Sequence, residues 1–137
     1  MSGFALDRRL ERDSHEVTEL GLCQVRLMDN RNFPWLVLVP MVAGASEWID
    51  LEREQQHQMS DEIMIASHLL KALVTPDKLN IATLGNQVSQ LHIHVIARYT
   101  TDVAWPNPVW GGASAFYGAE ELEKFLYELR VAFQALG

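Results

Sequence analysis

Two histidines separated by a single residue are the side chains of this sequence best placed to do chemistry. They lie in the segment Gln90 to Tyr99, where apolar and polar residues alternate. This alternation predicts a strand with Gln90, His92 and His94 on one face and its apolar residues on the other. At a rise of about 3.3 Å per residue, the two histidine Cα atoms would lie about 6.5 Å apart. A polar face of this kind binds either water or a ligand.

Three interpretations of the histidine pair follow from the residues alone. The first is a solvent-facing strand without a chemical role. The second is a metal site, but no other His, Cys, Asp or Glu occurs between Asn80 and Arg98, so a third ligand would have to come from elsewhere in the fold. The third is a nucleophilic imidazole with a second imidazole beside it, which suits neutral pH because free imidazole has a pKa of about 6.5.

The composition limits the kind of protein in which this pair works. The chain has 137 residues, with 11 basic and 18 acidic side chains and a net charge of −7. This suits one domain over residues 1–137 and argues against an extended nucleic-acid surface. Cys23 is the only cysteine, so neither an internal disulfide nor a multi-cysteine zinc site is possible. The longest apolar run, Phe33 to Ala45, is broken by prolines and is too short for a membrane span. We expect a cytoplasmic protein without a membrane partner.

The elements that must position the histidines follow from periodicity. Apolar residues at helical spacing predict a long central helix, with Asp50 as its N-cap, and a C-terminal helix. The order of strands and helices predicts an α+β fold with a mainly antiparallel sheet. The predicted ranges are a short N-terminal helix ending at Asp13, strands at Leu22–Met28 and Trp35–Val39 that form a hairpin, a helix at Arg53–Val74, strands at Asn80–Leu84 and Gln90–Tyr99, a loop at Trp105–Gly112 and a helix at Ala119–Leu136.

The residues around the histidines resemble a known family. The segment Gln90-Leu91-His92-Ile93-His94-Val95-Ile96 is similar to the motif His-φ-His-φ-His-φ-φ of the histidine triad (HIT) family, where φ is apolar, with glutamine in the first position. Asn80 and the turn Gly85-Asn86-Gln87-Val88 resemble the asparagine and the Gly-Gln-Ser/Thr-Val turn that precede that motif. The segment Asp29 to Pro40 resembles part of the family's first hairpin. The resemblance covers about Leu22 to Arg98.

The resemblance implies a HIT-like fold that pairs into a homodimer and acts on nucleoside monophosphates linked to phosphate, amine or sugar. His92 would attack the α-phosphorus and form a nucleotidyl-histidine that water hydrolyses, and no metal or other cofactor is implied for this step. His94 would contact the phosphate or the bridging oxygen. Asn80 and Gln87 would contact the phosphate or the leaving group, and Asp29 would hold the ribose hydroxyls. From the residues alone, Asp29 and Asn80 fit turn or cap roles equally well.

Three positions depart from the family's pattern and bear on activity. Gln90 cannot carry a positive charge, although its amide can orient neighbouring groups. Trp35 stands where many members have histidine, and Gln87 stands where serine or threonine is usual. The last change favours a dinucleoside polyphosphate hydrolase over an enzyme that releases an amine. The sequence therefore predicts a HIT-type hydrolase with His92, His94 and Gln90 as catalytic residues. The alternative is a nucleotide-binding module with little or no turnover.

Trp105 and Trp110 lie in the loop rich in proline and glycine that follows the histidines. Aromatic residues in such a loop cover a pocket, contact a second subunit or pack on the core, and the sequence leaves these alternatives open. His57 and His68 are predicted to be surface residues of the central helix. Cys23, in a strand pattern, is predicted to be a small buried hydrophobe.

Overall fold

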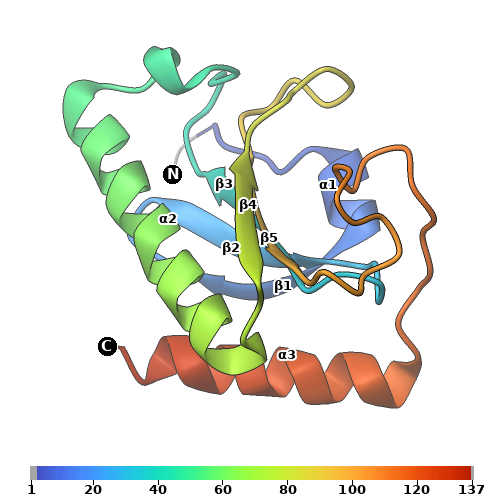
Figure 1. Cartoon of the computed structure of the whole chain (residues 1–137). Helices are drawn as coiled ribbons and strands as arrows, with labels where there is room; N and C mark the ends of the chain where they lie inside the picture. The colour runs from blue at the N-terminus through green and yellow to red at the C-terminus, as the bar shows by residue number, and fades with distance from the viewer. Residues whose placement is uncertain (1–2, 137) are drawn as a thin grey trace.

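The computed structural model of the chain describes residues 3–136, so Met1, Ser2 and Gly137 of the predicted domain lie outside it. The fold is α+β, with a five-stranded antiparallel sheet and helices on both of its faces (Figure 1). In chain order the elements are α1 (Arg8–Asp13), β1 (Ser14–Glu19), β2 (Cys23–Met28), β3 (Trp35–Pro40), a 3-10 turn (Trp48–Asp50), α2 (Arg53–Val74), β4 (Lys78–Ala82), β5 (Ile93–Arg98) and α3 (Ala119–Gln134).

The sheet has the strand order β1-β2-β3-β5-β4, so β5, which carries His94, lies between β3 and the edge strand β4. The predicted hairpin of β2 and β3 is confirmed. Every residue of β3 is buried, as its continuous apolar run requires of a central strand. Val37 on β3 pairs with Arg26 on β2 and with His94 on β5, which places the histidine in the middle of the sheet.

The two faces of the sheet carry separate cores. Helices α2 and α3 cover one face, whereas α1 and the long loop after β5 cover the other (Figure 1). The first core is the larger and includes Leu91, Ile93 and Val95, the apolar residues that alternate with the histidines. The second includes Leu10, Trp35, Val37, Ile96 and Val109. His92 and His94 therefore project toward the face with the smaller core.

The predicted central helix has the bounds expected for it, but its predicted cap is wrong. Glu52, not Asp50, is the N-cap of α2, and it forms a capping box with Gln55. Asp50 instead closes the preceding 3-10 turn, where its carboxylate accepts hydrogen bonds from the main-chain N–H groups of Ser46 and Glu47. The Asp50 carboxylate therefore bonds the N–H groups of the 3-10 turn rather than those of the first turn of α2, because the 3-10 turn holds its own N–H groups within reach of this side chain. None of the helices within residues 3–136 is long and apolar enough to cross a membrane.

The strands differ from prediction in three places. β1 was not predicted, because a β-bulge at Val17 gives it a burial period of three instead of two. β4 is two residues earlier than expected and ends at Ala82, which pairs with His94. β5 begins only at Ile93, since the main-chain N–H of Leu91 donates to Ala45 in the loop after β3 rather than to a strand. The segment 90–92 therefore leaves the ladder.

Several predictions about individual side chains are also decided. His57 and His68 are exposed and Cys23 is fully buried, as expected. Leu73 and Leu136 continue the apolar period of the two predicted helices, which predicts burial, but they are 38% and 61% exposed. Leu73 lies in the last turn of α2, and Leu136 lies two residues beyond the end of α3.

Candidate functional site

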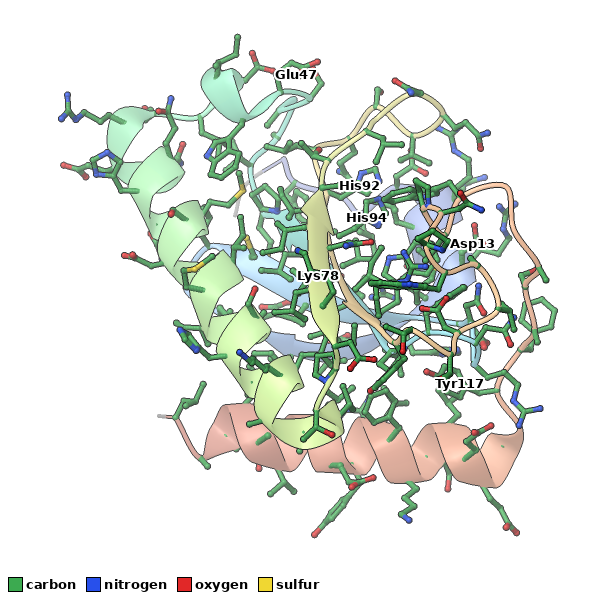
Figure 2. The ribbon with its side chains drawn as sticks, viewed as in Figure 1. Asp13, Glu47, Lys78, His92, His94 and Tyr117 are labelled. Carbon is green, nitrogen blue, oxygen red and sulfur yellow. The ribbon has the colours of Figure 1, made fainter. Side chains whose placement is uncertain are left out.

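A cavity of about 380 Å³ opens on the face of the sheet covered by α1 and the loop after β5. His92 and His94 are the most deeply buried of its polar residues, with 6% and 4% exposure. Figure 2 shows the two side chains next to one another, with Asp13 of α1 across from them. The cavity is lined by Arg9, Leu10, Asp13, Met28, Trp35, Leu84, Gly85, Asn86, Gln87, Val88, His92, His94, Trp110 and Gly111.

The main chain fixes the tautomer of His92. Its Nδ1 lies 2.6 Å from the main-chain oxygen of Gln90. A carbonyl oxygen only accepts, so Nδ1 carries the proton and donates it. The neutral ring therefore has its lone pair on Nε2, the form in which an imidazole acts as a nucleophile or a metal ligand.

The opposite tautomer is fixed on His94 by an indole. Trp35 Nε1 lies 2.9 Å from His94 Nδ1, and because an indole N–H only donates, Nδ1 must accept. The proton of neutral His94 is therefore on Nε2. Burial, and then the charge of His92, lower the pKa of His94 from 6.5 to about 3. His94 is thus a neutral hydrogen-bond donor at every physiological pH, and not a positive charge.

Aromatic rings surround the histidine pair. The rings of His92 and His94 meet edge-on, with centroids 4.9 Å apart. Trp110 packs edge-on against His94 at 5.0 Å and against Trp35 at 5.9 Å. Trp110 therefore lines the cavity and packs on Trp35, two of the roles that the sequence left open for it. Trp105 lies elsewhere, 5.7 Å from the guanidinium of Arg98.

A buried arginine anchors the loop that carries Trp110. The Arg98 side chain is almost fully buried and forms a two-point salt bridge with Asp102, whose pKa it lowers to about 2. Its guanidinium also donates to the main-chain oxygen of Asn107 and to the side chain of Asn80. These bonds tie the loop to β4 and β5, and so they hold the outer wall of the cavity in place.

Of the residues predicted to bind substrate, only Gln87 lines the cavity. Asn80 was expected to contact phosphate, but its side-chain oxygen is occupied by Arg98. Asp29 was expected to contact the ribose, but its two oxygens bind His15 Nε2 and the main-chain N–H of Tyr117, both at 2.9 Å. Figure 2 shows Tyr117 near the start of α3, well away from the histidines. The amide oxygen of Asn80 and both carboxylate oxygens of Asp29 therefore have partners within the protein.

Gln90 was predicted to share the face of the histidines, and the structure places it differently. It precedes β5, so strand alternation does not govern its direction. Its side chain is bonded to the main chain of Ala5 and Asp7 and is not among the residues that line the histidine cavity. The main-chain oxygen of Gln90, rather than its amide, is the group that acts on His92.

The sequence did not indicate that the N-terminal segment forms part of the site. Leu10 and the side chains of Arg9 and Asp13 line the cavity from α1. The hydrogen bond from Arg9 to the main-chain oxygen of Gln87 spans 78 positions of sequence, and no local pattern predicts such a contact. The residue type of Asp7 could have indicated the start of α1, because Asp7 caps this helix by accepting from the main-chain N–H of Arg9 at 2.8 Å.

The loop between β4 and the histidines turns as expected at Gly85, whose φ of +71° favours glycine. The metal interpretation has no support in geometry within residues 3–136, where no three His, Cys, Asp or Glu side chains converge on a possible ion position. The site is therefore a pair of imidazoles in a partly aromatic cavity, with Nδ1 donating in His92 and accepting in His94. A concave cavity with an apolar lining and a few polar groups is typical of a small-molecule site.

Fold and site together define a small α+β protein with a pocket for a small ligand beside its central strands. The pattern of the HIT domain family matches residues 9–101, which is more than half of the chain. The chain therefore belongs to the HIT domain family. A comparison with curated proteins gave no match.

Solved structures agree with this assignment. A histidine triad protein from Bradyrhizobium japonicum is 44% identical with a TM-score of 0.92, covering 95% of this chain and 98% of that one. One from Sinorhizobium meliloti is 43% identical with a TM-score of 0.92, at 96% and 98% coverage. One from Marinobacter aquaeolei is 39% identical with a TM-score of 0.94, at 99% and 100% coverage. The predicted HIT-like α+β fold is thereby confirmed.

Proposed function

We propose that this chain is a HIT-type nucleotidyl hydrolase that cleaves a phosphoanhydride of a dinucleoside polyphosphate-like nucleotide through a covalent intermediate on His92. One observation carries the proposal. The hydrogen bond from His92 Nδ1 to the main-chain oxygen of Gln90 leaves the lone pair on Nε2 of a residue that lines the cavity. A fixed tautomer of this kind is what a nucleophilic imidazole needs before substrate arrives.

In the first step, the Nε2 lone pair of His92 forms a bond to the α-phosphorus. The bond from that phosphorus to the bridging oxygen breaks, and the leaving phosphate keeps the electron pair. The ring of the intermediate retains its Nδ1 proton and is cationic, and the Gln90 carbonyl stabilises this charge. Water then attacks the phosphorus, the P–N bond returns its electrons to Nε2, and the proton of water passes to solvent.

The state of His94 favours a phosphate over an amine as leaving group. Its Nε2–H can donate a hydrogen bond to a phosphoryl oxygen, but with a pKa of about 3 it stays neutral and supplies no net proton. A departing phosphate is stable as an anion, whereas a departing amine needs a proton. Gln87 has no hydroxyl that could deliver a proton to a departing amine, which also favours a phosphate as leaving group. A kcat/KM for adenosine phosphoramidate equal to that for a dinucleoside polyphosphate would contradict this preference.

The alternative, a nucleotide-binding module with little turnover, also has a specific observation in its favour. Gln90 replaces the first histidine of the family's motif, and its side chain is engaged with the N-terminal segment. Any proton that the first histidine would supply is therefore missing. Binding without chemical turnover is the outcome that this alternative predicts.

Intact-mass spectrometry after brief mixing with diadenosine tetraphosphate, together with product analysis, tests the proposal. We expect AMP release or a transient adenylyl adduct that persists after chelator treatment. Loss of the imidazole in His92→Ala should abolish the adduct and reduce turnover by at least about a thousandfold. His68→Ala, which removes an exposed histidine of α2, is the matched control. Tight binding with neither adduct nor product would favour the binding module instead.

We further propose a cytoplasmic homodimer. Support for the homodimer comes from β4, an edge strand that pairs with β5 alone among the strands of residues 3–136, and from exposed apolar residues on and beside it, Ile81 and Leu84. Light scattering coupled to size-exclusion chromatography should give twice the mass of the 15.5 kDa chain. A monomer at micromolar concentration would contradict the proposal.

A further inference from the structure

The side chain of Gln90 fastens the N-terminal segment to the residues just before β5. The Gln90 amide accepts from the main-chain N–H of Asp7 and donates to the main-chain oxygen of Ala5, both at 2.8 Å. The partners are more than 80 residues away in sequence. The same residue uses its main-chain oxygen to hold His92. Gln90 therefore connects the position of the N-terminal segment to the position of the nucleophile.

The anchored segment brings an arginine to the mouth of the cavity. Asp7 accepts from Arg9 Nε at 3.3 Å and from Nη2 at 3.2 Å, while Arg9 Nη1 donates to the main-chain oxygen of Gln87 at 3.0 Å. These bonds use three of the five N–H groups of the guanidinium and leave two for a ligand. Arg9 is the only Lys or Arg among the described residues that line the cavity.

The depth of the two groups differs, and this assigns them different parts of a substrate. The side chain of Arg9 is 50% exposed, whereas His92 is 6% exposed. An α-phosphate in contact with His92 would lie deep in the cavity. A phosphate chain that continues from it must run outward, and Arg9 is the cationic side chain at the rim.

We propose that Arg9 recognises phosphates beyond the α-phosphate, and that Gln90 is the positioning residue that holds Arg9 there. This inference rests on the proposed nucleotide function of the site. It gives a role to the amide in place of the first histidine, namely building a substrate contact from the N-terminal segment. The positive charge of Arg9 is balanced by its ion pair with Asp7, and that of Arg12 by its ion pair with Asp13. The segment therefore has little net positive charge, and Arg9 binds phosphate through directed hydrogen bonds.

Calorimetric titration of AMP and ATP against four variants tests the inference, with GMP and GTP as a second pair so that the result does not depend on one base. Arg9→Gln should weaken ATP binding by about five- to tenfold and AMP binding by less than about twofold. Gln90→Ala should cause the same selective loss. The double variant should bind ATP no more weakly than the weaker-binding of the two single variants, because both substitutions remove the same contact, that of Arg9 with the phosphate. Arg8→Gln, an equal charge change on the same helix outside the cavity lining, should have no selective effect.

The outcomes separate this inference from the proposed hydrolysis. An equal loss for AMP and ATP in Arg9→Gln, a loss matched by Arg8→Gln, or additive losses in the double variant would each overturn the inference while turnover remains. ATP binding with the expected selectivity but without an adduct on His92 would support the inference and refute the hydrolase. Wild-type protein that binds none of the four nucleotides would refute both. If Gln90→Ala fails to fold, Arg9→Gln still tests the role of Arg9, because the half-exposed Arg9 side chain can be replaced without disturbing the core.

Discussion

Removing the imidazole of His94 should change how the stability of the protein depends on pH. The native pKa of this histidine is about 3, against 6.5 for an unrestrained side chain, chiefly because of burial. Between these two values the unfolded chain binds a proton at this position and the native protein does not. Stability from this group is therefore fully present above pH 6.5 and is lost as the pH falls toward 3.

The size of the effect follows from the two pKa values. Protonation of the unfolded state alone should remove about 2 kcal/mol of stability between pH 7 and pH 5, since each pKa unit corresponds to about 1.4 kcal/mol. The rings packed against His94 are those of His92, Trp35 and Trp110. Asp13 and Arg9 line the same cavity, but none of the salt bridges within residues 3–136 involves His94. No described ion pair therefore offsets the cost of charging its ring.

Urea denaturation followed by tryptophan fluorescence at pH 7 and pH 5 measures this difference. The variant His94→Asn retains an oxygen able to accept from Trp35 Nε1 but has no group that titrates. Its stability should fall by about 2 kcal/mol less than that of the wild type over this interval. His57→Asn, which changes an exposed histidine, should follow the wild type. Parallel losses in wild type and His94→Asn would mean that His94 is protonated in the native state, and would refute the neutral-donor role.

Three further predictions concern the neighbours of the site and its support. Trp35→Phe removes the donor to His94 Nδ1 and should cost about 1–2 kcal/mol and mix the ring tautomers, as long-range ¹H–¹⁵N NMR would show; an unchanged Nε2–H tautomer would contradict this. Glu62→Ala leaves the buried N–H groups of Leu22 and Cys23 unpaired and should lower the free energy of unfolding by about 2–4 kcal/mol in urea titrations. Glu62→Gln should lose less. A Glu62→Ala variant as stable as the wild type would show that water replaces the carboxylate. Burial raises the pKa of the Cys23 thiol, so the native protein should not react with Ellman's reagent at pH 8 until it unfolds, and rapid labelling of native protein would rule this out.

The sequence predicted an element correctly where the local pattern of apolar residues matches the side chains that the fold buries. The helix at Arg53–Val74 has the expected bounds because an amphipathic period is written in neighbouring residues. The central strand at Trp35–Pro40 is recognisable because burial on both faces demands a continuous apolar run. β1 escaped prediction because the bulge at Val17 shifts its period.

The sequence by itself determined the class of fold, the family and the pair of imidazoles, since the spacing of His92 and His94 and the apolar residues between and after them are local properties. Only the tertiary structure decided what surrounds the pair. It gave Trp35 the role of fixing His94, turned Gln90 toward the N-terminal segment and brought Arg9 to the cavity. These contacts join residues about 60 to 85 positions apart. Their energies depend on directed hydrogen bonds across packed elements, which residue type and spacing do not encode.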